Sequence, residues 1–466
     1  MSMIAQLLTL AVVVQGPPQS TSLLTTAHDW VVRLGHDMGD SIWPGFRPDT
    51  IPVLYVVKGE GTLLLGWRGE LPEGFLPIEG VANGGWKSSA DRGAASTGTS
   101  LAGRPTAQVT VSDSQSIAML VGLSTHEAFH VFEAASRKEG KRFGQQDNAM
   151  VVTSYPIFDP QNEAGMALEG RILEAAGRAT NKERRRTLAR QFLAVRESRH
   201  RALGAELAEF EQLAELNEGL AEYTLVRSVQ LAARRSDFPD RGGAARIATD
   251  KLTGLHKLTE DVTLSIRLRY YATGPAMGQL LDQLEGPAWK TRLINQNLTV
   301  QDALADASGY RAQELSLRRQ AESTFVIAKL RTAADSNVTG LRARRRARAD
   351  SVLSAPGVQL VVTVRGRYLG MCGLDPQNLL LVEPGVLLHM RWLQACAGDF
   401  QATFNTPVLQ EERTQTLRAV IGADSTVVVT PGPDGGVRVE SPLVSLRAAK
   451  ADVSRDGQVL TIKIGS

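Results

Sequence analysis

The stretch Leu123-Ser124-Thr125-His126-Glu127-Ala128-Phe129-His130-Val131-Phe132 carries the pattern His-Glu-x-x-His. Apart from Glu127, the residues between and around the histidines are small or apolar and include no proline, which favours a buried helix. Residues four apart lie one above the other on an α-helix, so His126 and His130 can both reach one metal ion. Glu127 lies about 100° round the helix from His126, where its carboxylate can contact a water molecule on that metal without being a ligand. The pattern predicts a metal-dependent site, although two histidines and a glutamate can also meet by chance on a core helix.

The chain before this stretch has the pattern of a small subdomain with both helix and sheet. Apolar residues at helical spacing predict a helix over 22–38. The runs 51–57 and 62–67 flank a glycine-containing turn and predict a β-hairpin. The stretch 69–104, rich in glycine, serine and proline, predicts loop or weak sheet, and 107–111 predicts a short strand just before the motif.

After the motif, the sequence pattern changes once, from helical spacing to short strand-like runs. Helical spacing of apolar residues continues over 163–229 and again over about 310–350. After Ala355-Pro356-Gly357 the sequence turns to short apolar runs at regular spacing, which predict a separate all-β domain of the sandwich type. The expected fold class is therefore α+β. We expect a candidate signal peptide at 1–19, an N-terminal α/β subdomain at 20–113, a mainly helical domain at 114–350 and the all-β domain at 355–466.

Length and charge narrow the classes of protein that fit. A chain of 466 residues is too long for one ordinary core, so two or three domains are expected. The net charge is only +3, which argues against a nucleic-acid partner. The basic runs 184–186 and 342–348 have the pattern of solvated helix faces rather than of a phosphate-binding surface.

The N-terminus and the cysteines bear on localisation. The apolar run 3–14 has the length of the hydrophobic part of a signal peptide and is too short to span a bilayer, but no Lys or Arg precedes it, and it could equally be a buried strand. Cys372 and Cys396 could form one disulfide in an oxidising compartment or remain two buried thiols. We expect an exported protein, periplasmic, cell-surface or extracellular, with no transmembrane span beyond the candidate signal segment.

The metal site needs a third ligand. A catalytic zinc ion takes three protein ligands and keeps one position open. In the segment 215–223, Glu218 and Glu222 lie four apart on one helical face, so Glu218 can be the ligand while Glu222 hydrogen-bonds the free ring nitrogen of a histidine. Glu169, which is nearer in sequence, is the alternative third ligand.

Two segments resemble a known family. Asn217-Glu218-Gly219-Leu220-Ala221-Glu222-Tyr223 looks like the second zinc helix of the gluzincin peptidases, the superfamily of thermolysin and aminopeptidase N. Tyr271-Ala272-Thr273-Gly274 resembles the Tyr-x-x-Gly segment of the aminopeptidase-N-like branch. The resemblance implies that Tyr271 stabilises the oxyanion, with Tyr270 as the alternate. Without the resemblance, both tyrosines fit ordinary core or interface positions.

The chain departs from this family in two ways. Glu218 follows His130 by 88 residues (218 − 130), a much longer separation than in the family, so the helical segment 163–214 is an insertion that we expect to project outward. The Gly-Ala-Met-Glu-Asn segment that binds a free substrate amine in the aminopeptidases is absent, and Ala82-Asn83-Gly84-Gly85 lacks the carboxylate to replace it. This absence favours an endopeptidase.

The expected function is that of a zinc-dependent peptidase acting on peptides or proteins. Glu127 is the general base and Tyr271 the oxyanion donor. In many zinc peptidases an edge strand just before the motif helix pairs with the substrate backbone, and 107–111 is the strand expected to do so here. The alternative is a non-catalytic cell-envelope or extracellular binding protein that keeps a metallopeptidase-like fold, although the intact Glu127 argues against it.

Overall fold

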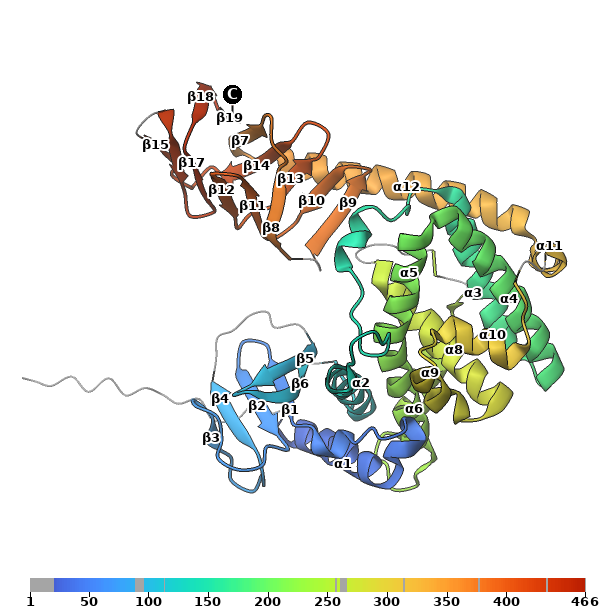
Figure 1. The fold of residues 1–466 in the computed structure, drawn as a ribbon. Helices are drawn as coiled ribbons and strands as arrows, with labels where there is room; N and C mark the ends of the chain where they lie inside the picture. Colours follow the sequence, from blue (N-terminus) through green and yellow to red (C-terminus); the bar gives the residue numbers. More distant parts are fainter. Residues whose placement is uncertain are drawn as a thin grey trace, which may run out of the picture.

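The computed structural model describes residues 21–88, 96–112, 114–255, 258–259, 266–312, 315–375, 378–432 and 435–465. These residues form an N-terminal sheet with one helix, a central helical region and a C-terminal region of strands (Figure 1). This three-part layout confirms the α+β class. The candidate signal peptide at 1–19 lies outside the described residues.

The N-terminal part is a helix packed beside a six-stranded sheet. Its elements are α1 (Thr21–Ile42), η1 (Pro48–Thr50), β1 (Val53–Val57), β2 (Gly61–Leu65), β3 (Leu76–Pro77), β4 (Gly85–Ser88), β5 (Thr97–Leu101) and β6 (Arg104–Val111). The strand order is β3-β4-β2-β1-β6-β5. β1 and β2 are antiparallel, with Val53 opposite Leu65, which confirms the predicted hairpin.

The expectation that 107–111 forms the edge strand before the motif is wrong. These residues belong to β6, which lies between β1 and β5, and β5 is the edge. Ala102 and Gly103 both have positive φ, as a type I′ hairpin turn requires, and this turn adds β5 outside β6. β5 consists mostly of Thr, Gly and Ser, so its sequence resembles loop more than strand.

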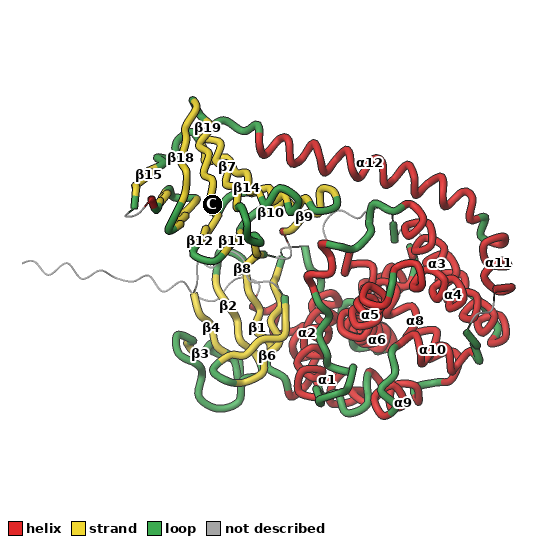
Figure 2. Tube along the Cα trace, turned by 45° about the horizontal axis from the view of Figure 1, so that its top comes forward, coloured by secondary structure: helices red, strands yellow, loops and turns green. Residues whose placement is uncertain are grey.

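The central region surrounds the motif helix. Its elements are α2 (Ile117–Ser136), η2 (Ala149–Thr153), α3 (Pro160–Arg178), α4 (Lys182–Leu203), α5 (Ala205–Ala214), η3 (Glu215–Gly219), α6 (Leu220–Arg234), α7 (Arg241–Leu252), η5 (Ile266–Arg269), α8 (Tyr270–Glu285), α9 (Ala288–Asn295), α10 (Val300–Ser308), α11 (Leu315–Thr324) and α12 (Ile327–Leu353). α2 packs against β5 and β6 on one side and against α6 on the other (Figure 2). This double packing explains why most residues of α2 are buried.

The C-terminal part is a sandwich of two sheets. Its strands are β7 (Gly357–Val364), β8 (Gly370–Leu374), β9 (Leu379–Glu383), β10 (Val386–His389), β11 (Leu393–Ala397), β12 (Phe400–Phe404), β13 (Val408–Glu411), β14 (Thr416–Gly422), β15 (Val428–Pro431), β16 (Val437–Glu440), β17 (Val444–Ala448), β18 (Ala451–Asp456) and β19 (Val459–Ile464). One sheet has the order β18-β19-β7-β14-β13-β10-β9 and the other β15-β16-β17-β12-β11-β8. Apolar residues of both sheets, such as Leu360 and Phe400, share one core.

The sandwich is packed onto the helical region. An apolar cluster joins Leu379, Leu381 and Leu387 of β9 and β10 to Tyr155 and Tyr270 of the helical region. α12 runs from the helices to the sandwich and contacts α3, β9 and β14 (Figure 1). Among the helices that the structure describes, none has the length and hydropathy that a membrane span needs.

Candidate metal centre

The motif helix α2 is fixed in place on the N-terminal side of the motif. Ser116 caps it, with the side chain accepting a hydrogen bond from the Met119 backbone N–H. The Tyr55 hydroxyl of β1 lies 2.9 Å from Ser124 Oγ in a buried hydrogen bond that ties the sheet to the helix. These contacts hold the face of α2 that carries His126 in a defined orientation.

A glycine lets α6 come close to α2. A Cβ at Gly122 would lie 2.9 Å from Leu225 Cγ, so only glycine allows this packing distance without a shift of Leu225. The close approach places the carboxylates of η3 and α6 beside the histidines of α2. Glu218 comes from η3 and Glu222 from the first turn of α6.

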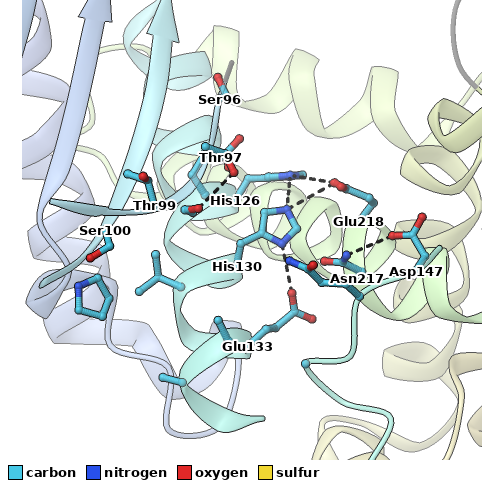
Figure 3. Close-up of a pocket in the computed structure, with 18 of the residues that line it drawn as sticks. Ser96, Thr97, Thr99, Ser100, His126, His130, Glu133, Asp147, Asn217 and Glu218 are labelled. Atoms are coloured by element: carbon cyan, nitrogen blue, oxygen red, sulfur yellow. Dashed lines mark hydrogen bonds and ion pairs between the residues drawn. The ribbon is translucent and has the colours of Figure 1, made fainter. Parts of the chain in front are cut away.

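His126, His130 and Glu218 converge to form the candidate metal centre (Figure 3). The two Nε2 atoms are 3.2 Å apart, and Glu218 Oε2 lies 3.6 Å from that of His126 and 3.4 Å from that of His130. Tetrahedral Zn²⁺ with bonds of about 2.0–2.1 Å separates its ligand atoms by about 3.3–3.4 Å. The spacing of the three atoms therefore fits a zinc ion.

The outer nitrogen of each imidazole is held by a carboxylate. His126 Nδ1 lies 3.0 Å from Glu222 Oε2, and His130 Nδ1 lies 3.3 Å from Glu133 Oε2. Where the carboxylate is ionised it only accepts, so Nδ1 donates to it and a neutral ring then keeps its lone pair on Nε2. Glu218 Oε2 is also buried and accepts no hydrogen bond from the described residues. Once the Nε2 atoms lose their protons, both rings and Glu218 Oε2 would direct lone pairs at one point, where a metal ion can bind.

The charges around the site favour a cation as well. Burial lowers the pKa of both histidines, but the neighbouring carboxylates outweigh burial and raise the pKa to about 9 for His126 and about 10 for His130. Burial raises the pKa of Glu218, but the two imidazoles outweigh it and hold this pKa well below its ordinary value. Without metal the site binds protons, and a metal ion can take their place.

Arg267, which also pairs with Asp147, holds the outer oxygen of Glu218. Arg267 Nη2 donates to Glu218 Oε1 and to Asp147 Oδ1, each at 2.8 Å. Asn217 also donates to Asp147 Oδ1, at 3.3 Å (Figure 3). With Oε1 occupied by Arg267, Oε2 is the oxygen that Glu218 presents to the histidines.

Two glycines bring Tyr271 to the same site. A Cβ at Gly274 would lie 2.2 Å from the Cα of Gly219, so α8 and η3 touch backbone to backbone at these two residues. The Tyr271 ring consequently stacks on His126, with ring centroids 5.6 Å apart. Burial and the nearby Glu218 carboxylate raise the pKa of Tyr271, so its hydroxyl stays protonated and can donate. The two segments with the family resemblance thus meet through their glycines.

The site opens into a cleft of about 570 Å³. It is lined by Glu127, His126, His130, Glu218 and Tyr271, together with Ser96 and residues 97–100 of the edge strand β5. Burial raises the pKa of the Glu127 carboxyl, which is only 5% exposed. Tyr270, the alternate to Tyr271, is fully buried and belongs to the apolar cluster shared with the sandwich.

Glu169, the alternative third ligand, lies elsewhere. It is fully buried and accepts hydrogen bonds from Arg196 Nε at 2.9 Å and from Arg199 Nε at 2.6 Å. Within the described ranges, one group of three His, Cys, Asp or Glu side chains lies close enough together to share a metal ion. This group is His126, His130 and Glu218.

The segment 163–214 does not project outward as expected. Its helices α3 and α4 both pack against α8, and α5 leads directly into η3 (Figure 1). The expectation was wrong because helical periodicity marks apolar faces and does not show that buried charges such as Glu169 and Arg196 pair with each other.

Sequence reasoning missed Glu133, Asp147 and Arg267. Glu133 could have been found, because it lies three residues after His130 and therefore on the same helical face. Asp147 and Arg267 come from distant segments and carry no such signal. No protein-family model, curated protein or solved structure matches the chain. Function is therefore inferred from the geometry of the cleft.

Proposed function

We propose that the chain is a zinc-dependent peptidase of the gluzincin type, with endopeptidase action favoured. The observation that carries this proposal is the convergence of His126, His130 and Glu218 in a cleft that Glu127 and Tyr271 also line. A metal-binding protein without catalysis has no use for a buried carboxylate and a phenol beside the metal ligands.

The residues of the cleft have complementary roles in peptide hydrolysis. A zinc ion held by the metal centre supplies Lewis acidity, which polarises a carbonyl group and makes water nucleophilic at neutral pH. Glu127 takes the proton of the attacking water and passes it to the leaving amine. Tyr271 donates a hydrogen bond to the carbonyl oxygen as it gains negative charge. Glu222 and Glu133 keep the two imidazoles oriented.

The edge strand β5 is the proposed docking site for the substrate backbone. Its residues 97–100 line the cleft, as does Ser96 just before it, and its outer edge pairs with no other strand of the described sheet. A peptide in extended conformation can add to such an edge through main-chain hydrogen bonds. A Cβ at Gly98 would lie 3.4 Å from His130 Cβ, so β5 runs in contact with the motif helix.

Blocked peptides test the activity and the endopeptidase assignment together. Zinc-loaded protein is incubated with a library of quenched fluorescent peptides that are acetylated at the N-terminus and amidated at the C-terminus. We expect internal cleavage by the wild type and a loss of about 10²–10⁴-fold in kcat for Glu127→Gln, with zinc content unchanged. Cleavage at a wild-type rate by Glu127→Gln would contradict the mechanism, and cleavage of unblocked peptides alone would contradict the endopeptidase assignment.

We also infer that the protein is exported. Cys372 and Cys396 form a disulfide between the neighbouring strands β8 and β11, with Cα atoms 6.0 Å apart. Such bonds persist mainly in oxidising compartments. Alkylation of the protein as extracted from cells should label neither cysteine before reduction and both afterwards, and labelling before reduction would argue against export.

A further inference from the structure

A buried ionic cluster lies behind the metal centre and has no part in the proposed chemistry. Its members are less than a tenth exposed: Glu163, Glu169, Arg196, Arg199, His200, Glu211, Glu215 and Arg269. Burying so many charges is unfavourable unless they are paired and hydrogen-bonded. These charges are therefore expected to have a role beyond filling the core.

One member of the cluster belongs to the same turn as the metal ligand. Glu215 opens η3, and Glu218 lies three residues later in it. Arg196 Nη1 donates to Glu215 Oε1 at 2.7 Å and to Oε2 at 2.8 Å, and Thr273 Oγ1 donates to Oε1 at 2.7 Å. Arg196 is itself held by Glu169, which accepts from its Nε. Glu215 thus joins η3 to α4 and to α8.

The winding of η3 explains why the hydrogen bonds of Glu215 matter for the direction of Glu218. Residues three apart on an α-helix lie only about 60° apart round its axis, so Glu215 and Glu218 would point to nearly the same side. η3 is a π-helical turn, a rare and wider winding that is frequent at functional sites. In this turn Glu215 faces the ionic cluster while Glu218 faces the two histidines.

We propose that Arg196 is a positioning residue for the metal centre. Through Glu215, and together with Thr273, it holds η3 in the π-helical winding that aims the Glu218 carboxylate at His126 and His130. The inference rests on the proposed zinc site. It gives the segment 163–214 a role, because α4 supplies the arginine and α3 supplies Glu169, which orients that arginine.

Zinc affinity tests the proposal in the full-length protein. The dissociation constant for Zn²⁺ is measured by competition with a chromophoric chelator, and the electronic spectrum of bound Co²⁺ reports the ligand geometry. We expect Arg196→Lys and Thr273→Val to weaken zinc binding about tenfold or more, in the range seen when support of a metal ligand is lost. The Co²⁺ spectrum should change in the same variants.

Matched variants separate positioning from general destabilisation. Thr273→Ser keeps the hydroxyl and should restore wild-type affinity. Thr224→Val makes the same chemical change at another fully buried threonine, whose hydroxyl bonds to Ala221 O of its own helix, and should leave the affinity unchanged. Arg199→Lys alters an arginine that shares Glu169 but pairs with Glu211 instead of Glu215, and should lower stability without weakening zinc binding.

The outcomes distinguish this inference from the proposed function. If Arg196→Lys does not fold, Thr273→Val decides, because it removes one hydroxyl and keeps the side-chain volume. Folded variants that bind zinc as tightly as the wild type would overturn the positioning role. A folded wild type that binds no zinc would overturn the proposed function, and the inference with it.

Discussion

Glu133 and Glu222 each contact the Nδ1 atom of one imidazole, but only Glu222 was predicted from the sequence. Glu222 was predicted because it lies four residues after Glu218, whereas Glu133 was missed although it lies three after His130. We predict that Glu133→Gln and Glu222→Gln each weaken zinc binding about 10–100-fold, because the imidazole loses a charged partner. Chelator competition measures this effect. Affinity within error of wild type for both variants would show that the histidines are oriented in another way.

The adjacent tyrosines Tyr270 and Tyr271 have different surroundings. We predict that Tyr271→Phe lowers kcat about 10²–10³-fold without loss of zinc, because a donor to the oxyanion is removed. Tyr270→Phe is the control, since its buried hydroxyl has no hydrogen-bond partner among the described residues and its removal should not lower stability. Steady-state kinetics and urea unfolding measure the two effects. A larger loss of kcat in Tyr270→Phe would reverse the assignment.

The sequence does not show which of these two tyrosines faces the cleft, and the reason is physical. Both stand at the start of α8, where too little helix precedes them for an apolar pattern to show which of the two faces the core. The structure decides because Ile266 and Tyr270 both join the apolar cluster with the sandwich. Arg267 and Tyr271, each one residue later, then line the cleft.

The contact between α8 and η3 sets the distance of Tyr271 from Glu218. We predict that Gly274→Ala lowers stability by about 1–3 kcal/mol, as overpacking does, and also lowers kcat, because the helices must separate. Gly177→Ala is the control: Gly177 lies in α3 with open space around its Cβ position, so the change should be neutral or stabilising. Unfolding curves and kinetics test both variants. Unchanged kcat in Gly274→Ala would show that the close contact has no bearing on the site.

Helices were more predictable than the strands around the site. The motif helix and the segment 163–229 showed clear periodicity, and the structure has helices in both. β5 was not recognised because small polar residues fill it, and the edge was therefore assigned to β6. The π-helical turn η3 also lies within a helical pattern that gives no sign of its different winding.

The division of the chain into three parts follows from its changes of pattern, but the packing between the parts does not. The change to short strands after Gly357 marks the sandwich. The cluster that joins Leu379 and Leu381 to Tyr270 depends on contacts between distant segments, which no local pattern reveals. The sandwich therefore supports the segment that carries Tyr271.

Two buried histidines should make the stability of the whole chain depend on pH. Burial lowers the pKa of His28, and likewise that of His389, to about 4. Between pH 6.5 and 4 the unfolded chain binds more protons at these positions than the folded chain, so their contribution to stability is lost as the pH falls. We predict that the unfolding free energy of His28→Leu falls less across this window than that of wild type, by up to about 3 kcal/mol. Urea unfolding at several pH values measures the difference, and identical pH profiles would contradict the prediction.

The central claim is that Glu218 completes a zinc centre with His126 and His130. Bound zinc per chain is measured by elemental analysis after reconstitution and dialysis, on wild type, Glu218→Gln and Glu169→Gln. Each variant replaces one buried carboxylate with an amide of equal size. We predict one zinc ion in wild type, none in Glu218→Gln, and one zinc ion held with at most weaker affinity in Glu169→Gln. No zinc in folded wild type, or loss of zinc in Glu169→Gln alone, would contradict the claim.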